Sequence, residues 1–427
     1  MRSRPLHLCQ FLSISACVLA TSVPVNTAEA IPAFARKYGT ACTTCHVGGP
    51  RKLNAFGESF KLNGYRMPRP TETDQRRHEE IQLGAPARKQ LFPNTVWPGE
   101  LPQAVGISFL GQHRFSVDLE RNAGQSRFKS PSIFAMVLGG TLGDGFGFFG
   151  EYVLFVNGNS GLGHLLIAIT DPFEKILPRG ALSFRVGRFA PAIEPYPDNN
   201  RRTISHNSVS DYRVVPGGFR LRDRQAGIEA YGRPTGRILW TTGIVNGENP
   251  LDDATNHKDL YAALEFKLGG SPYLDPSPAS PGSPSWHDNS LTLGLGGWFG
   301  RHQIQPTDGT PFANKFGRLV GKLRFKLFDL DTQAAIAWGR DKNPTGAGTS
   351  VDSLAWTVQS DYVVYPWLQF VLRYDELHVD AQETSRVITP HVSLFARMNV
   401  WLRLETAIDI GRNTDRPEIQ LDLSYAF

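Results

Sequence analysis

The last nine residues of the chain, IQLDLSYAF, alternate strictly between apolar and polar side chains. In an extended strand, successive side chains point to opposite sides, so this segment has one apolar and one polar face. The apolar face carries Ile419, Leu421, Leu423, Tyr425 and Phe427. A single strand of this kind fits either a soluble sandwich or a membrane barrel.

The alternation recurs in KLRFKLF (322–328), LQFVLRYD (368–375) and LRLETAIDI (402–410). About sixteen strand-like segments follow one another between residues 102 and 427, many near the roughly ten-residue length of a tilted membrane strand. In a transmembrane barrel the apolar face meets lipid and the charged face lines the lumen. We therefore predict an all-β fold, an outer-membrane antiparallel β-barrel of about 16 strands over residues 101–427; a soluble β-protein is the alternative.

The connections between these segments favour the membrane barrel, because short turns alternate with long loops. Short turns are expected at 143–145, 232–236, 329–331, 365–366 and 398–399, and long loops at 189–224, 246–257, 301–312, 340–350 and 378–386. The Pro/Ser-rich stretch 269–288 falls where a short turn is due and predicts a floppy insertion. Aromatic residues beside the turns predict interfacial girdles: Tyr365, Trp367, Trp401 and Phe427.

Residues 1–30 have the features of a secretory signal peptide. Arg2 and Arg4 precede a short apolar segment, and Ala28-Glu29-Ala30 matches a small-residue cleavage site. Cleavage would remove two basic residues and one acidic residue, which lowers the net charge from +5 to +4. This small excess gives no argument for nucleic acid as a partner. No long apolar run after residue 30 predicts a transmembrane helix.

The front of the mature chain has a different pattern. Leu53, Phe56 and Phe60 recur at helical spacing, and Gly64 and Pro68 are typical of a helix end. Residues 71–100 are charged, lack periodicity and contain prolines near their end, so they read as a linker. We therefore expect a small α-helical domain over residues 31–70, joined by this linker to the barrel.

This front domain contains the motif Cys42-x-x-Cys45-His46, and the signal peptide would leave no other cysteines. A Cys42–Cys45 disulfide would close a very small loop and stabilise little. A zinc site would lack an evident fourth ligand. Covalent haem c needs only what is present, because two thiols form thioether bonds and the adjacent histidine ligates the iron. We predict one haem c attached through Cys42 and Cys45, with His46 as proximal ligand.

The distal iron ligand is left open by the sequence. Met67 is the candidate within the front domain, and a methionine ligand would raise the reduction potential. The alternative for Met67 is a packing role. His78 in the linker, and His113 and His164 in or near strands, are further alternatives.

The motifs IPAFARKYGTACTTCH and LNAFGESFKLNGY resemble the front domain of the fused outer-membrane monohaem cytochrome–porins of iron-oxidising bacteria. The resemblance is specific over residues 31–66 and architectural over the barrel. It implies electron transfer from extracellular ferrous iron to periplasmic carriers, a c-type cytochrome or a copper protein. Iron-oxidising members tend to have arginine where this chain has Glu58. The electron donor, and whether the chain is an enzyme with Fe(II) oxidase activity, are therefore left open.

These features together predict a single-haem electron conduit through the outer membrane, with the haem domain held in the barrel lumen. One haem in the periplasm could not connect the two sides of an insulating wall whose apolar band is roughly 25 Å tall. The alternative is a diffusion porin with a tethered periplasmic cytochrome domain that acts as a carrier or sensor. The expected partners are outer-membrane lipid, an extracellular electron donor and a periplasmic electron carrier.

Overall fold

The computed structural model describes residues 33–49, 51–67, 80–82, 100–102, 106–118, 126–143, 145–156, 158–197, 200–247, 257–277, 283–304, 310–411 and 418–427. The chain divides into two compact units, residues 1–30 and 31–427. The predicted signal peptide lies outside the described residues. Within the described ranges, none of the helices is long and apolar enough to cross a bilayer.

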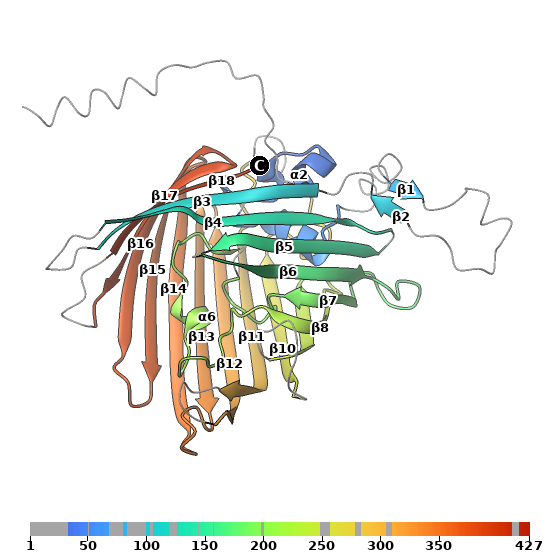
Figure 1. Cartoon of the computed structure of the whole chain (residues 1–427). Helices are drawn as coiled ribbons and strands as arrows, with labels where there is room; N and C mark the ends of the chain where they lie inside the picture. Colours follow the sequence, from blue (N-terminus) through green and yellow to red (C-terminus); the bar gives the residue numbers. More distant parts are fainter. Residues whose placement is uncertain are drawn as a thin grey trace, which may run out of the picture. The chain divides into compact units, whose positions relative to one another are not determined.

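Sixteen antiparallel strands form a closed barrel in which each strand pairs with its neighbours in the chain (Figure 1). They are β3 (Gly106–Asp118), β4 (Ser126–Thr141), β5 (Phe146–Val156), β6 (Asn159–Thr170), β7 (Ser183–Phe189), β8 (Gln225–Gly232), β9 (Ile238–Val245), β10 (Asp259–Gly269), β11 (Ser290–Ile304), β12 (Phe312–Leu327), β13 (Leu330–Asp341), β14 (Val351–Tyr365), β15 (Leu368–Val379), β16 (Ser385–Arg397), β17 (Val400–Asp409) and β18 (Glu418–Ala426). The prediction of a barrel of about sixteen strands is confirmed.

The last strand of the barrel closes onto the first. β18 pairs with β3 over nine residues, from Glu418 opposite Asp118 to Ala426 opposite Leu110. Beyond that ladder the backbone N–H of Phe109 donates to the oxygen of Phe427 at 2.7 Å, and the N–H of Phe427 donates back at 3.0 Å. Closure leaves the barrel without an unpaired strand edge. Such an edge would place unpaired backbone N–H and C=O groups in the bilayer, which is strongly unfavourable.

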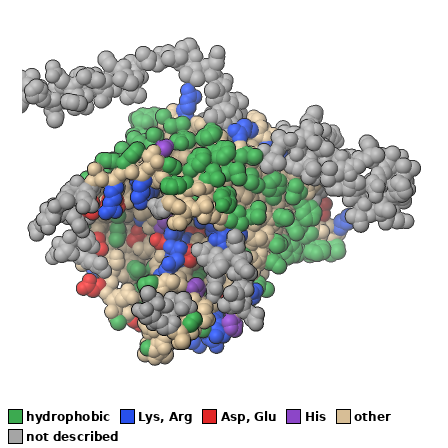
Figure 2. All heavy atoms as spheres, viewed as in Figure 1, with side chains coloured by type: hydrophobic (Ala, Val, Ile, Leu, Met, Phe, Trp, Pro, Cys, Tyr) green, Lys and Arg blue, Asp and Glu red, His purple; other side chains and the backbone are tan. Residues whose placement is uncertain are grey.

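The two faces of the strands separate apolar from charged side chains as the alternation predicts. On β12, Leu323 and Phe325 are exposed on the outer face, whereas Arg324 and Lys326 face inward and are paired. Figure 2 shows hydrophobic side chains gathered over the outer faces of neighbouring strands. The outer face is therefore suited to hydrocarbon, and the charged residues are buried in the interior of the barrel.

The aromatic residues beside the turns differ in how exposed their side chains are. Tyr365 and Trp367 are exposed and stack at 5.3 Å, and Phe427 is also exposed. Trp401 is only 3% exposed and packs in a cluster with Phe395. The expectation that Trp401 belongs to an outer girdle is wrong, because it shares the inward face of β17 with Arg403 and Glu405.

The end of the barrel where β3 begins and β18 ends carries mostly short connections, as predicted. The Pro/Ser-rich connection between β10 and β11 lies at this end, and its described parts are 270–277 and 283–289. The N–H of Tyr273 donates to the oxygen of Gly236 at 2.7 Å, and Trp286 Nε1 donates to Asp329 at 2.8 Å. For these residues the expectation of a floppy insertion is wrong, because they are tied to the neighbouring turns.

At the opposite end the longest connection joins β7 to β8. It includes the short helix α6 (Ser208–Asp211), and its side chains contact inward-facing residues of β13, β14 and β15. We call its described residues, 190–197 and 200–224, the strap. Figure 1 shows the strap with α6 inside the ring of strands.

Within residues 33–49 and 51–67, the structure shows three short helices: α2 (Ala33–Tyr38), the 3₁₀ helix η1 (Cys42–Thr44) and α3 (Ala55–Leu62). Asn54 caps α3, since its side chain accepts from the N–H of Gly57 at 2.9 Å. Gly64 follows the helix with φ = +68°, the left-handed conformation expected at a helix C-terminus. We call residues 33–49 and 51–67 the plug. In the predicted linker, β1 (Glu80–Gln82) pairs with β2 (Glu100–Pro102), a short element that the sequence did not reveal.

Candidate functional site

The plug is held against the inner wall of the barrel by buried charges. Lys52 Nζ lies 2.6 Å from Asp331 on β13 and also pairs with Asp361 on β14. Further along the plug, in α3, the carboxylate of Glu58 accepts a hydrogen bond from Arg324 of β12 at 2.6 Å. Buried charges are strongly unfavourable unless paired, so these contacts fix the plug to one side of the lumen.

The opposite side of the plug is aromatic. Phe34 packs on Phe60 and Tyr65 with ring centroids 5.1 and 5.6 Å apart, and Tyr65 stacks on Phe149 of β5 at 4.8 Å. Small residues in the wall allow this approach, because a Cβ at Gly139 would meet the ring of Phe34. The plug thus contacts the wall through ion pairs on one side and stacked rings on the other.

The Cys42-x-x-Cys45-His46 motif lies in this plug as a single tight turn. The N–H groups of Cys45 and His46 both donate to the oxygen of Cys42, at 3.2 and 2.9 Å. Both cysteines are free thiols. Burial raises the pKa of Cys42, and it raises the pKa of Cys45 to about 12. Both sulfurs are therefore protonated at neutral pH.

His46 is half-buried, and its buried Nδ1 is unused. Its Nδ1 has no hydrogen-bond partner among the described residues. Burial lowers the pKa of His46 to about 4, so the imidazole is neutral at pH 7. A neutral imidazole with an unpartnered buried nitrogen is the chemistry that a ligand to iron requires. Two thiols beside such a histidine therefore fit covalent haem.

Helix α3 packs directly against the motif. At Gly57 an added Cβ would overlap the backbone oxygen of Cys45, so glycine permits this close approach. The N–H of Asn54 donates to the same oxygen at 2.9 Å, and the Asn54 amide donates to the oxygens of Thr43 and Thr44. The residues after the motif thus hold its backbone in place.

The structure separates the four candidates for the distal ligand. Met67 is 7% exposed and belongs to the same apolar cluster as Phe60 and Tyr65, so its ligation stays a prediction. His78 lies outside the described residues. His113 stacks on Tyr425, an outward-facing residue of β18, at 5.7 Å. His113 therefore lies on the outer face and cannot reach a lumenal iron, so that alternative is wrong.

His164 faces the lumen but is engaged by its neighbours. Its Nδ1 lies 2.8 Å from Glu151, and Arg224 of the strap donates to its ring at 3.2 Å. His164 also lies edge-on to Phe149, with ring centroids 5.8 Å apart. Its contacts assign it to a polar network that joins the strap to β5, which disfavours it as an iron ligand.

The strap meets the plug directly after the Cys42-x-x-Cys45-His46 motif, a contact that the sequence did not predict. Arg202 of the strap donates to the oxygens of Val47 and Gly48, the latter at 3.1 Å. The strap is anchored to the wall on both sides of this contact. Arg373 of β15 donates to Thr203 at 2.6 Å, and Glu405 of β17 accepts from the N–H of Ile204 at 2.6 Å. The one feature of the sequence that could have indicated this contact was the unusual length of the loop over residues 189–224.

The zinc interpretation can be compared with the side-chain positions. Across the ranges that the structure describes, no group of three or more His, Cys, Asp or Glu side chains is placed to hold a metal ion. A structural zinc site would need four such ligands around Cys42, Cys45 and His46. Covalent attachment of haem needs no such cage, because the thiols bond to the porphyrin and only the histidine bonds to the iron.

Comparison with known proteins relates the chain to porins by structure alone. No known family model matches it, and no curated protein matches its sequence. The anion-selective porin of Comamonas acidovorans superposes with a TM-score of 0.54 at 12% identity, over 76% of this chain and 99% of that one. The fold is that of a porin.

Two further solved structures give the same result. The outer-membrane channel DcaP of Acinetobacter baumannii matches with a TM-score of 0.53 and 11% identity, over 76% of this chain and 97% of that chain. OmpF of Salmonella typhi, in complex with daunomycin, matches with a TM-score of 0.52 and 10% identity over the same shares. At these identities the likeness concerns the porin fold, and the plug must be interpreted from its own residues.

Proposed function

We propose that this chain is an outer-membrane electron-transfer conduit, in which one haem c held in the lumen passes electrons between an extracellular donor and periplasmic carriers. The observation that carries the proposal is the position of the attachment motif. The turn after His46 is contacted by Arg202 of the strap, which enters the lumen from the long-loop end. The motif thus lies between the two ends of the barrel rather than outside it.

The outer membrane is the compartment that fits this barrel. Leu404, Leu423 and Phe370 are 46%, 45% and 44% exposed on the outer face, where water contact would be unfavourable. Bacterial barrels keep their short turns in the periplasm and their long loops outside the cell. By that rule the plug enters from the periplasmic end and the strap from the extracellular end.

The residues of the plug have distinct roles in holding the haem. The thiols of Cys42 and Cys45 would form thioether bonds to its vinyl groups, and the neutral imidazole of His46 would ligate the iron. When bound, the haem supplies one-electron exchange between ferric and ferrous iron. Gly57 lets α3 press against the motif, and Asn54 fixes its carbonyl groups. These contacts keep the ligand set rigid, which suits electron transfer without bond-making on a substrate.

The plug and the strap also obstruct the lumen. Lys52 and Glu58 tie the plug to β12, β13 and β14, while the strap is bonded to β15 and β17. A lumen filled from both ends should pass few ions. The conduit also requires that carriers exchange electrons with the haem from both mouths. The proposed partners are an extracellular donor, with ferrous iron as the candidate that the resemblance supplies, and a periplasmic c-type cytochrome or copper protein.

The proposal is tested first by the haem content of the chain and then by reduction of the haem from outside the cell. Intact mass and pyridine haemochrome spectra should give one haem c for each chain, and Cys45→Ser should prevent normal double attachment. A membrane-impermeant reductant added outside intact cells should then reduce the haem. His46→Ala should abolish low-spin coordination while the barrel still assembles. A chain without covalent haem, or a haem that outside reductants leave oxidised, would overturn the conduit.

The porin fold itself supports a second function, a diffusion porin whose cytochrome domain is unrelated to transport. Deletion of residues 31–70 separates the two, because the strands that direct assembly are untouched. In planar bilayers the conduit should conduct ions poorly until this deletion opens the lumen. Equal conductance with and without the plug would favour the diffusion porin.

A further inference from the structure

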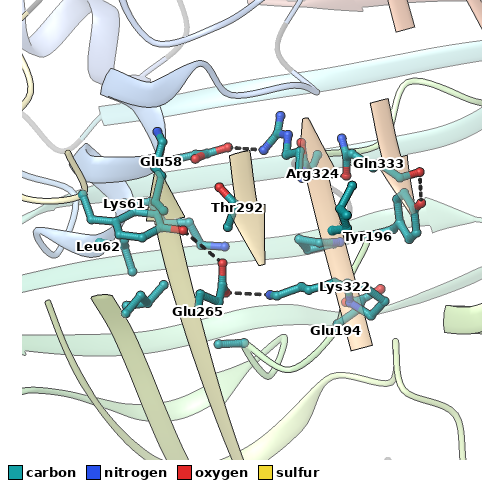
Figure 3. A pocket seen from close by; sticks show the side chains of 18 of the residues that line it. Glu58, Lys61, Leu62, Glu194, Tyr196, Glu265, Thr292, Lys322, Arg324 and Gln333 are labelled. Carbon is teal, nitrogen blue, oxygen red and sulfur yellow. Dashed lines mark hydrogen bonds and ion pairs between the residues drawn. The ribbon is translucent and has the colours of Figure 1, made fainter. Parts of the chain in front are cut away.

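A charged cavity of about 160 Å³ lies inside the barrel beside the plug. Figure 3 shows side chains from three sources converging on it: Glu58 and Lys61 from α3, Tyr196 from the strap, and Lys322 and others from β10 to β13. The cavity has room for a small polyatomic ion together with several waters. Its lining does not include Cys42, Cys45 or His46, so it is distinct from the motif.

The cavity wall carries more positive than negative side chains. Its basic members are Lys61, Arg185, Lys267, Lys322, Arg324 and Lys326, and its acidic members are Glu58, Glu194 and Glu265. Most of the bases are neutralised in pairs: Lys267 Nζ lies 2.7 Å from Asp288, and Lys322 Nζ lies 2.6 Å from Glu265. Lys61 is the one lining base that has no ion pair among the described residues.

Unused hydrogen-bond donors also line this cavity. The Nε of Arg185 and the Nε2 of Gln333 are buried and have no hydrogen-bond partner in the part of the chain that the structure describes. Arg185 and Gln333 are only 5% and 4% exposed. Buried donors are rarely left unpaired, so these groups are available to an acceptor held in the cavity.

The environment of Lys61 indicates the charge of that acceptor. Burial and, to a smaller extent, Arg185 of β7 lower the pKa of Lys61 to about 8, although Glu229 of β8, Glu194 of the strap and Glu58 of α3 act in the opposite direction. A buried ammonium near a second cation is stabilised by an anion. The acceptor missing from the wall is therefore negatively charged.

We propose that this cavity binds one small oxyanion of phosphate size, with Lys61 as its charged anchor. The site does not depend on electron transfer. Two sources share this chemistry: a free inorganic oxyanion, and the carboxylates of the haem c invoked under the proposed function. In either case the anion would join α3 of the plug to the barrel wall by charge-assisted hydrogen bonds.

The test is calorimetric titration of inorganic phosphate into the full-length protein in detergent, at constant ionic strength. Lys61→Met keeps the stem and removes the charge, so phosphate affinity should fall roughly tenfold or more, because hydrogen bonds to charged groups are worth about 1.5–3 kcal/mol. Lys61→Arg should retain most of the affinity. Lys315→Met, which removes an exposed charge on the outer face, should leave it unchanged.

A double variant, Cys42→Ala with Cys45→Ala, separates the two sources. Equal phosphate binding with and without these thiols assigns the cavity to a free anion. Binding that appears only in the double variant assigns it to the haem carboxylates. The heat-modifiable gel mobility of each variant reports that the barrel has assembled, and haem content is measured separately. Absence of phosphate binding in both assembled proteins, or binding that Lys61→Met leaves unchanged, would overturn the proposal.

Discussion

Lys52 Nζ lies 2.6 Å from Asp331 Oδ2, with their side chains only 2% and 15% exposed. This ion pair joins two parts of the chain: the plug, which carries the Cys42-x-x-Cys45-His46 motif, and the strand β13, which forms part of the wall. Asp361 of β14 shares the same ammonium group. This buried lysine with two carboxylate partners is one of the contacts that hold the motif in the lumen, beside the Glu58–Arg324 pair.

Lys52→Met should loosen the plug. Removing one partner of a buried ion pair costs roughly 3–5 kcal/mol, because the remaining carboxylates lose their counter-charge. Arg324 and Arg202 lie close to Asp331 and Asp361 and will offset part of this cost. Single-channel recordings should show frequent openings to the conductance of the plug-deleted barrel. Lys315→Met, which removes an exposed lysine, should show none; identical traces for the two variants would mean that Lys52 does not hold the plug.

Gly57→Ala should disturb the motif without affecting the barrel. The new Cβ would overlap the backbone oxygen of Cys45, so α3 must move away from the turn that presents both thiols. We expect less covalent haem per chain in pyridine haemochrome assays, at unchanged heat-modifiable mobility. Gly161→Ala is the matched control, because a Cβ there meets nothing within 4 Å. Full haem loading of the Gly57 variant would show that this contact is dispensable.

The barrel was predictable from the sequence because its signal is local. Alternation of period two in residues 322–328 already separates Leu323 and Phe325 from Arg324 and Lys326, and the structure keeps that separation. For Trp401, the residue type led to a wrong expectation about which face of the barrel it occupies. Its place beside a turn suggested an outer girdle, yet the same alternation puts it on the inward face of β17.

The plug contacts and the cavity were not predictable, because they join residues far apart in the chain. Arg202 and Gly48 are separated by 154 positions. Nothing in the local sequence distinguishes Arg202 or Lys52 from a solvated surface residue. Lys61 likewise has no local signal, since its environment is made by strands that follow it by more than a hundred residues. Such contacts depend on how the loops enter the lumen.

Acid should weaken the contact between the plug and β12. Burial raises the pKa of Glu58, but Lys326, Arg324 and Lys267 together outweigh burial and hold the pKa at about 2. A carboxyl whose pKa falls on folding stabilises the folded state above its ordinary pKa, and that contribution is lost as pH falls through the lowered value. The stabilisation by Glu58 should therefore be complete above about pH 4.5 and decline towards pH 2.

Conductance measured between pH 5 and pH 2 checks this expectation. The wild-type barrel should open progressively over that window. Glu58→Gln, which cannot carry the charge, should open more readily at pH 7 and lose this acid-dependent step. Glu174→Gln, an exposed carboxyl on the β6–β7 connection, should keep the wild-type profile. A pH profile that Glu58→Gln leaves unchanged would assign the acid response to other groups.

The assignment of the two barrel faces has its own test in neighbouring residues of β17. Leu404 is 46% exposed on the outer face, so Leu404→Arg would place a charge in lipid at a cost of roughly 2–4 kcal/mol near the midplane. Arg403→Leu changes the inward face instead. It removes an ion pair with Asp422, but Arg114 remains 2.8 Å from that carboxylate. Assembly into lipid vesicles, followed by heat-modifiable mobility, should therefore fail more often for Leu404→Arg. Equal yields of the two variants would contradict a membrane-facing outer surface, because only lipid makes a charge at position 404 worse than a lost charge at position 403.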